Sequence, residues 1–284
     1  LRQVRSPFGP IEEVTLRRLL SHSAGFRAGT WPWGGDQPWH PFEPPGWAQV
    51  AAMLPYTRVE FPPGSRFQYS NPGIVFLGRI IEHLTNEDFE VYIDKHILRP
   101  LEMRDSSFDL TPPYRLAHKS QSYVVRDGVR TRQPFDPDTG VTVSNGGLNA
   151  PVADLAKWVR FLIGRPADAA TRARYDTVLA RRSLEEMWRP RVDAPGEGDS
   201  GGAGAMGLAF FLETHFDRAY VGHSGHQNGF VSHFYVDPGR GVGYVVAFNT
   251  EVWPGAQAPR GTDQVDREIR DTLFTRVFPA LQRR

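Results

Sequence analysis

The first apolar positions of the chain recur at helical spacing. Leu16, Leu19 and Leu20 fall on one helical face and predict a short helix within residues 11–22. Thr15 precedes them, and its hydroxyl can accept a hydrogen bond from a free backbone N–H of the first turn. The sequence therefore predicts a capped helix close to the start of the chain.

Helical spacing is interrupted between residues 26 and 63 and then resumes. The interrupted stretch is rich in Pro, Gly and Trp, which predicts a long irregular loop ordered by its aromatic side chains. Two apolar stripes between Asn71 and Pro100 predict two helices in series. A third stripe predicts a helix over 151–163 that ends at Gly164, so the first two-thirds of the chain should be mainly helical.

The pattern changes in the last third, where short segments rich in β-branched and aromatic residues alternate with Gly, Asn and Pro. The segments that predict an antiparallel meander are 206–213, 218–225, 229–237 and 241–249. A last helical stripe over 263–282 has acidic residues near its start and arginines at its end, as the helix dipole favours. We expect this C-terminal helix to pack on the sheet.

These elements predict an α/β fold of the α+β type in one intimately packed unit. Residues 1–205 form its mainly helical region, and residues 206–284 form the antiparallel sheet with the C-terminal helix. The Gly-rich run 196–204 is the predicted connection, and a cleft is expected between the two parts.

Composition narrows the class of function. With 284 residues, 40% hydrophobic and 12% aromatic, the chain can bury a large core. Its 33 basic and 32 acidic side chains nearly cancel, so charge gives no reason to expect nucleic acid or an anionic membrane as partner. The absence of Cys excludes disulfides, thiolate zinc sites and Cys nucleophiles, and no apolar run is long enough to form a transmembrane segment.

Two segments contain the residues with the most chemical information. The first, FPPGSRFQYSNPG (61–73), comes directly before a predicted helix and contains Tyr69 and Asn71. The second, VGHSGHQNGFVSHFYVD (221–237), starts on a predicted strand and contains the triplet His-Ser-Gly at 223–225. Single triplets are weak signals, so their order and their structural setting carry the inference.

Taken together, the two segments resemble the second and third motifs of the class C β-lactamase, D-peptidase and esterase group, Tyr-x-Asn and Lys/His-x-Gly. LRRLLSHSAG (16–25) and SNGGLNAPVADLAKW (144–158) resemble further segments of that family, in the same order. The resemblance covers nearly the whole chain. It implies the β-lactamase/transpeptidase-like fold of serine hydrolases and penicillin-binding proteins, in which an antiparallel sheet is flanked by helices beside a mostly helical region.

The resemblance implies acyl transfer from an ester, amide or peptide substrate to a serine nucleophile, with no cofactor. Tyr69 and the lysine of a Ser-x-x-Lys motif exchange the serine proton, and Asn71 hydrogen-bonds the substrate or that lysine. The strand edge at Ser224 and Gly225 receives the substrate, and the backbone N–H of His226 is one oxyanion donor. Gly225 leaves room for the acyl group.

The nucleophile motif itself is not found in this sequence, because no serine has Lys at the third following position. In the family's order the motif lies ahead of LRRLLSHSAG. We therefore expect the nucleophile helix and the N-terminal strands to belong to a missing N-terminal segment of the same protein, a partner without which this chain is inactive. The strand 241–249 should then have an unpaired edge. The family favours a periplasmic or secreted location.

His223 stands where many relatives have a charged lysine that grips a substrate carboxylate. An imidazole is mostly neutral near pH 7, so this residue favours an esterase or a D-amino-acid peptidase over a β-lactamase. The alternative is that His223 is a strand histidine with a satisfied hydrogen bond and no role in chemistry.

Three other interpretations remain open at this point. The chain could be a non-catalytic binding or scaffold relative of the same fold. Ser23 within SHSAG (21–25) could be the nucleophile of an α/β-hydrolase, although that arrangement needs a preceding strand and the spacing here is helical. His223, His226 and His233 could suggest a metal site, but their odd and even offsets place them on opposite faces of a strand, so no metal is expected.

Overall fold

The computed structural model describes residues 1–26, 46–135, 138–195, 204–216, 218–255 and 260–281. At its centre lies a six-stranded antiparallel sheet with the strand order β10-β9-β8-β7-β6-β5. Its strands are β5 (Val192–Asp193), β6 (Gly204–Met206), β7 (Phe211–His215), β8 (Arg218–Gln227), β9 (Phe230–Asp237) and β10 (Val242–Phe248). The predicted meander is confirmed in β7 to β10.

Local turn chemistry explains the two longest hairpins. Asn228 and Gly229 join β8 to β9 with positive φ angles of 48° and 78°, as a type I′ turn requires. Between β9 and β10 the backbone N–H of Arg240 donates to Asp237 Oδ1 at 3.0 Å, and Gly241 takes a φ of 73°. Both turns use residues that tolerate the backbone conformation, so the register follows from the sequence.

The prediction of one strand over 206–213 is wrong. The chain folds back between β6 and β7, where the backbone N–H of Gly207 donates to the carbonyl of Phe210 at 2.9 Å and Ala209 has a φ of 61°. The apolar run therefore supplies two paired strands. The reversal involves an alanine with positive φ, which the apolar pattern does not signal.

The helices follow the predicted stripes in most places. They are α1 (Leu16–Leu20), α2 (Trp47–Met53), α3 (Asn71–Thr85), α4 (Phe89–Ile93), α5 (Val143–Gly146), α6 (Val152–Ile163), α7 (Ala169–Val178), α8 (Arg181–Met187), α9 (Thr262–Thr272) and α10 (Phe278–Leu281). Thr15 caps α1 as predicted, since its Oγ1 accepts from the backbone N–H of Arg18 at 3.3 Å. The helix α2 corrects the loop predicted over 26–63, of which 27–45 lie outside the described residues.

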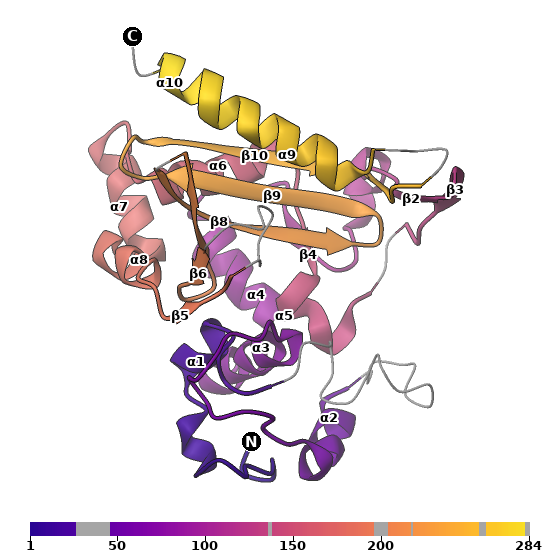
Figure 1. The fold of residues 1–284 in the computed structure, drawn as a ribbon, viewed down its shortest axis with the longest axis vertical. Helices are drawn as coiled ribbons and strands as arrows, with labels where there is room; N and C mark the ends of the chain where they lie inside the picture. Colours follow the sequence, from indigo (N-terminus) through magenta and orange to yellow (C-terminus); the bar gives the residue numbers. More distant parts are fainter. Residues whose placement is uncertain (27–45, 136–137, 196–203, 217, 256–259, 282–284) are drawn as a thin grey trace.

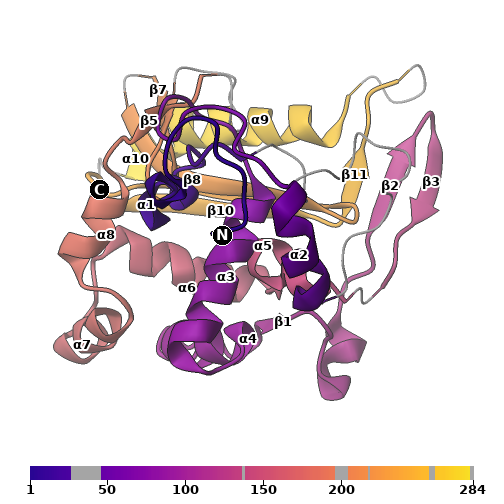
Figure 2. The same ribbon diagram turned by 90° about the horizontal axis from the view of Figure 1, so that it is seen from below.

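Helices cover both faces of the main sheet (Figures 1 and 2). On one face α9 and α10 pack through Phe274 and Phe278, and Phe274 stacks on Tyr220 of β8 at 3.8 Å between ring centroids. On the other face α6 packs on β9 and β10, and its Val159 belongs to the same core cluster as Val221 of β8 and Val236 of β9. The observed layers match the predicted α/β fold with an antiparallel sheet flanked by helices, and no helix in the described ranges is both long and apolar enough to cross a bilayer.

Two smaller sheets lie beside the main one. The pair β1 (Ser107–Phe108) and β4 (Leu148–Asn149) is antiparallel, and β11 (Thr250–Val252), β2 (Tyr123–Arg126) and β3 (Val129–Arg132) form the other sheet. The short α5 directly precedes β4, and Gly146 at its end lies against Gln227 of β8. A Cβ on Gly146 would lie 2.2 Å from Gln227 Oε1, so a larger residue here would require the flexible Gln227 side chain to move.

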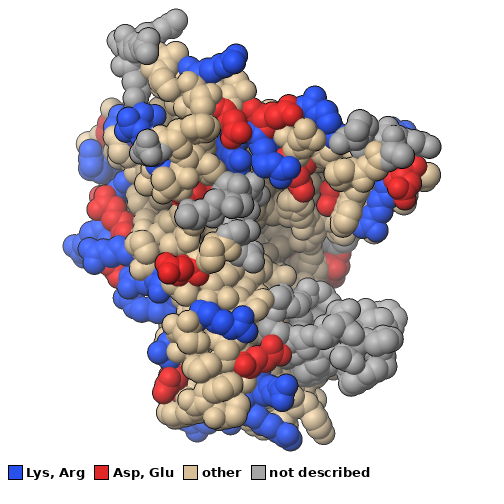
Figure 3. Space-filling view, in the orientation of Figure 1, with Lys and Arg blue, Asp and Glu red and all other residues tan. Residues whose placement is uncertain are grey.

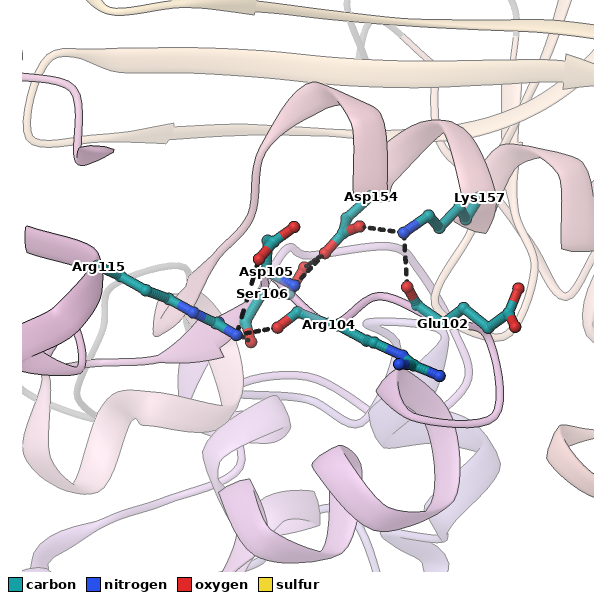
Figure 4. A network of polar contacts seen from close by, with 7 residues as sticks. All are labelled: Glu102, Arg104, Asp105, Ser106, Arg115, Asp154 and Lys157. Carbon is teal, nitrogen blue, oxygen red and sulfur yellow. Dashed lines mark hydrogen bonds and ion pairs between the residues drawn. The ribbon is translucent and has the colours of Figure 1, made fainter. Parts of the chain in front are cut away.

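The buried carboxylate of Asp154 connects the start of α6 to the segment that precedes β1 (Figure 4). Asp154, only 1% exposed, accepts hydrogen bonds from the backbone N–H of Asp105 at 2.8 Å and from Ser106 Oγ at 2.9 Å. Lys157 Nζ donates to Asp154 Oδ1 at 2.7 Å and to the carbonyl of Glu102 at 2.5 Å. Because the buried charge is paired and hydrogen-bonded, it ties the first turn of α6 to the segment entering β1. Since β1 pairs with β4, which directly follows α5, the same network helps to anchor α5 beside the end of β8.

Candidate functional site

The residues around Tyr69 enter α3 in an extended conformation. Ser70 caps the helix, because its Oγ accepts from the backbone N–H of Gly73 at 3.3 Å, and Asn71 is the first helical residue. The Tyr69 ring stacks on His22 with ring centroids 4.1 Å apart and an interplanar angle of 28°. The Tyr-x-Asn segment is therefore anchored at a helix start on one side and on the α1 loop on the other.

The strand β8 brings His223 to Tyr69. Their ring centroids are 6.3 Å apart, and the ring of Phe211 in β7 lies beside both, 5.1 Å from the His223 ring and 6.4 Å from the Tyr69 ring. The pairing of β7 with β8 ends where Phe211 faces Gly222, so among the described strands residues 223–227 pair with β9 alone. This stretch is the strand edge on which the third motif was predicted.

The structure separates the predicted site residues by face. Side chains alternate along β8, so His223 and Gly225 share the face toward Tyr69, whereas Ser224 and His226 lie on the face covered by α9. A Cβ on Gly225 would meet nothing within 4 Å. The His226 imidazole instead lies 3.7 Å from Glu251 Oε1. Only the backbone of Ser224 and His226 is available to the predicted site.

The groups that converge here are uncharged near neutral pH. Burial raises the pKa of the Tyr69 phenol above its usual range. Burial, with a smaller contribution from His223, lowers the pKa of His22 to about 3. Burial also lowers the pKa of His223. Because the Ser224 carbonyl can only accept, His223 Nδ1 must donate to it at 2.6 Å, which leaves the lone pair on Nε2.

The molecular surface near these elements also has few charged side chains (Figure 3). In the space-filling view a hollow opens between the main sheet and the helical region below it, and side chains other than Lys, Arg, Asp and Glu make up most of its wall (Figure 3). The same two parts of the chain supply His223 and Tyr69. An uncharged site of this kind suits a neutral group better than an ion.

Two alternative interpretations find no support in the geometry. Ser23 follows α1 and not a strand, is 3% exposed, and its Oγ lies 2.9 Å from Ser21 Oγ, so it is not at a nucleophile elbow. Within the described ranges, no three His, Cys, Asp or Glu side chains gather closely enough to hold a metal ion. His233 in particular turns to Asp266 of α9, with Nδ1 2.7 Å from Oδ2.

The sequence analysis missed two residues of the site, His22 and Phe211. His22 lies in the SHSAG segment (21–25), which was weighed only as a possible nucleophile elbow. Phe211 lies within a run that was predicted as a single strand. Helical or strand spacing contains no signal for a ring contact between segments so far apart in the chain, so neither residue could be placed from its local pattern.

Comparisons with known proteins agree with the fold. The family model for Beta-lactamase matches residues 7–267. The unguisins hydrolase ungD′ of Aspergillus campestris is 25% identical over 84% of this chain and 42% of its own length. The octameric penicillin-binding protein homologue from Pyrococcus abyssi is 27% identical, with a TM-score of 0.65 over 85% of this chain and 56% of that chain.

The fold is shared with more distant structures as well. A D-stereospecific amidohydrolase from Streptomyces sp. superimposes with a TM-score of 0.70 at 19% identity, over 96% of this chain and 76% of that chain. The chain spans less than half the length of the unguisins hydrolase that it matches. Since the family model covers far more than half of the residues, this chain belongs to the beta-lactamase family.

Proposed function

We propose that residues 1–284 form part of a serine hydrolase that transfers acyl groups from neutral esters or amides. The observation that carries this proposal is that the Tyr69 ring lies beside His223, where β8 pairs with only one described strand; the two ring centroids are 6.3 Å apart. Tyr69 passes the proton of a serine nucleophile, and Asn71 hydrogen-bonds the substrate. The backbone N–H of His226 is an oxyanion donor, beside the open space in front of Gly225.

The nucleophile comes, in this proposal, from a Ser-x-x-Lys segment outside residues 1–284. Two observations support it. No serine in the sequence is followed by Lys at the third position. Among the described strands β10 is at the end of the main sheet, although Tyr244 faces the C-terminal helix and Val245 faces the opposite core. An edge strand that packs against helices on both faces can pair with a further strand, because its outer N–H and C=O groups lie in line with the sheet.

The neutral groups that residues 1–284 supply to the site favour substrates without a carboxylate next to the reacting carbonyl. A neutral His223 offers no permanent cation to such a carboxylate, and the rings of Phe211 and Tyr69 beside it are apolar. Esters and the amides of D-amino acids fit these surroundings. The Streptomyces neighbour is itself a D-stereospecific amidohydrolase, which is consistent with the second substrate class.

Exchanging His223 for lysine tests this proposal. In the protein completed with its nucleophile segment, we expect the ratio of kcat/KM for a D-alanyl-D-alanine free acid to that for its methyl amide to rise about tenfold in His223→Lys. A new charge-assisted hydrogen bond to the carboxylate has about that effect. His83→Lys, at an exposed position at the end of α3, is the control and should leave the ratio unchanged. A wild-type protein that already prefers the free acid would contradict the assignment.

A non-catalytic scaffold relative is the second candidate function. The missing Ser-x-x-Lys motif is the observation that favours it. The two candidates differ in one respect, because a scaffold has no reactive serine even when the rest of its protein is present.

A further inference from the structure

His22 has an unusual backbone conformation at the end of α1. The backbone N–H of Ser23 donates to the carbonyl of Arg18 at 2.9 Å, and that of His22 donates to the carbonyl of Leu19 at 3.1 Å. These are the two bonds of a Schellman motif, in which the residue after the helix cap is left-handed and usually glycine. Here it is His22, with a φ of 51°. A strained non-glycine residue suggests that its side chain has a task.

The side chain and backbone of His22 hold three consecutive residues. Its carbonyl accepts from the backbone N–H of Gln68 at 2.8 Å, and its Nδ1 accepts from the backbone N–H of Ser70 at 3.1 Å. Between these two contacts its ring stacks on Tyr69 at 4.1 Å. We call these contacts of His22 with residues 68–70 the His22 clamp. His22 is 2% exposed, so the clamp is shielded from water.

The charge state of His22 suits the clamp. An imidazole that accepts a hydrogen bond at Nδ1 must carry its proton on Nε2 and be neutral. Burial lowers the pKa of His22 to about 3, so the ring is neutral near pH 7. A charged ring would lose the bond from Ser70, and the stacked phenol would then face a cation.

We propose that His22 is a positioning residue, whose ring and Nδ1 hold the Tyr69 phenol and the Ser70 backbone in the geometry used for proton transfer. This inference rests on the proposed function of Tyr69. Nothing about the strained backbone requires a histidine for folding, since glycine fits the left-handed position better. The contacts of the imidazole with Tyr69 and Ser70 account for a histidine at this position.

Three variants of residues 1–284 separate this role from a merely structural one. His22→Gly suits the backbone but removes the ring and Nδ1. His22→Asn tolerates the left-handed conformation and offers Oδ1 in place of Nδ1, without the ring. Asn86→Gly is the matched control, because Asn86 also ends a helix, α3, with a φ of 56°. Each is labelled with 13C at tyrosine Cζ for NMR, and the exchange of the Ser70 amide hydrogen is followed in parallel.

In His22→Gly we expect the Tyr69 Cζ signal to move towards that of a water-exposed tyrosine, and the Ser70 amide to exchange about tenfold faster after loss of a buried acceptor. His22→Asn should restore the protection of Ser70 but not the Tyr69 signal. Asn86→Gly should change neither. If His22→Gly does not fold, His22→Asn still tests the proposal, because its Ser70 amide should be protected as in the wild type while its Tyr69 signal should be shifted.

If His22→Gly folds and both the Tyr69 signal and the Ser70 exchange rate match the wild type, the proposal is overturned. If His22→Gly does not fold, an unchanged Tyr69 signal in His22→Asn overturns it. Neither measurement requires turnover of a substrate, so both test the clamp even if the protein does not hydrolyse esters or amides. In the completed hydrolase, kcat should fall in His22→Gly with KM nearly constant. A normal kcat with both NMR signals changed would show that the clamp exists and that Tyr69 is not the proton carrier.

Discussion

Replacing Tyr69 by phenylalanine should lower kcat about 100- to 10,000-fold in the protein completed with its nucleophile, the range expected for loss of a general acid or base. The phenyl ring keeps the stacking on His22 and the contact with Phe211, so the fold should be retained. KM for a p-nitrophenyl ester should change little, because the hydroxyl is used in proton transfer and not in ground-state binding. Steady-state kinetics with that ester provide the measurement.

Tyr92→Phe is the control for this substitution. Tyr92 lies in α4 and packs on His96 with ring centroids 4.4 Å apart, so it has no part in the site. Its kcat should match that of the wild type. A Tyr69→Phe variant with the kcat of the wild type would remove Tyr69 from the mechanism.

Gly225→Leu is expected to lower kcat/KM about 100-fold while leaving stability nearly unchanged. A Cβ at this position meets nothing within 4 Å, so the leucine projects into the space assigned to the acyl group and misplaces the substrate. In the folded chain the change resembles an ordinary surface substitution, with an effect on unfolding within about 0.5 kcal/mol. Kinetics and urea unfolding of the same sample measure the two effects.

Gly222→Ala gives the opposite pattern and serves as the matched comparison on the same strand. A Cβ on Gly222 would lie 2.2 Å from the carbonyl oxygen of Phe234, which is backbone and cannot move aside cheaply. We expect a loss of about 1–3 kcal/mol in the free energy of unfolding. If Gly225→Leu retained full activity, the substrate would have to bind elsewhere.

Much of the fold could be predicted because local chemistry and tertiary structure agree. The meander follows from β-branched strands joined by Asn-Gly and Asp-Pro-Gly turns, and α6 follows from its apolar stripe and from Gly164 at its end, with a φ of 71°. The helices α7 and α8 were missed. The helix α7 has no buried residue, so it contains little of the apolar periodicity on which the prediction relied.

The site could be predicted in part, for a different reason. Tyr69, Asn71 and His223 stand in motifs whose order resembles a family, and the structure brings Tyr69 and His223 together. His22 could not be found in this way. Its role depends on a left-handed backbone and on contacts with residues 68–70, neither of which leaves a periodic trace in the sequence. The burial that keeps the three rings uncharged is likewise a property of the packed chain.

The central claim is that Tyr69 and the edge of β8 serve a serine outside residues 1–284. Labelling with a fluorophosphonate, followed by mass spectrometry, tests it most directly on two samples: residues 1–284, and the same residues expressed with the coding sequence on the N-terminal side of Leu1. We predict that the label attaches to the serine of a Ser-x-x-Lys motif in the added segment and to no serine of residues 1–284. Label on Ser23 or any other serine of residues 1–284, or no label on either sample, would contradict the account.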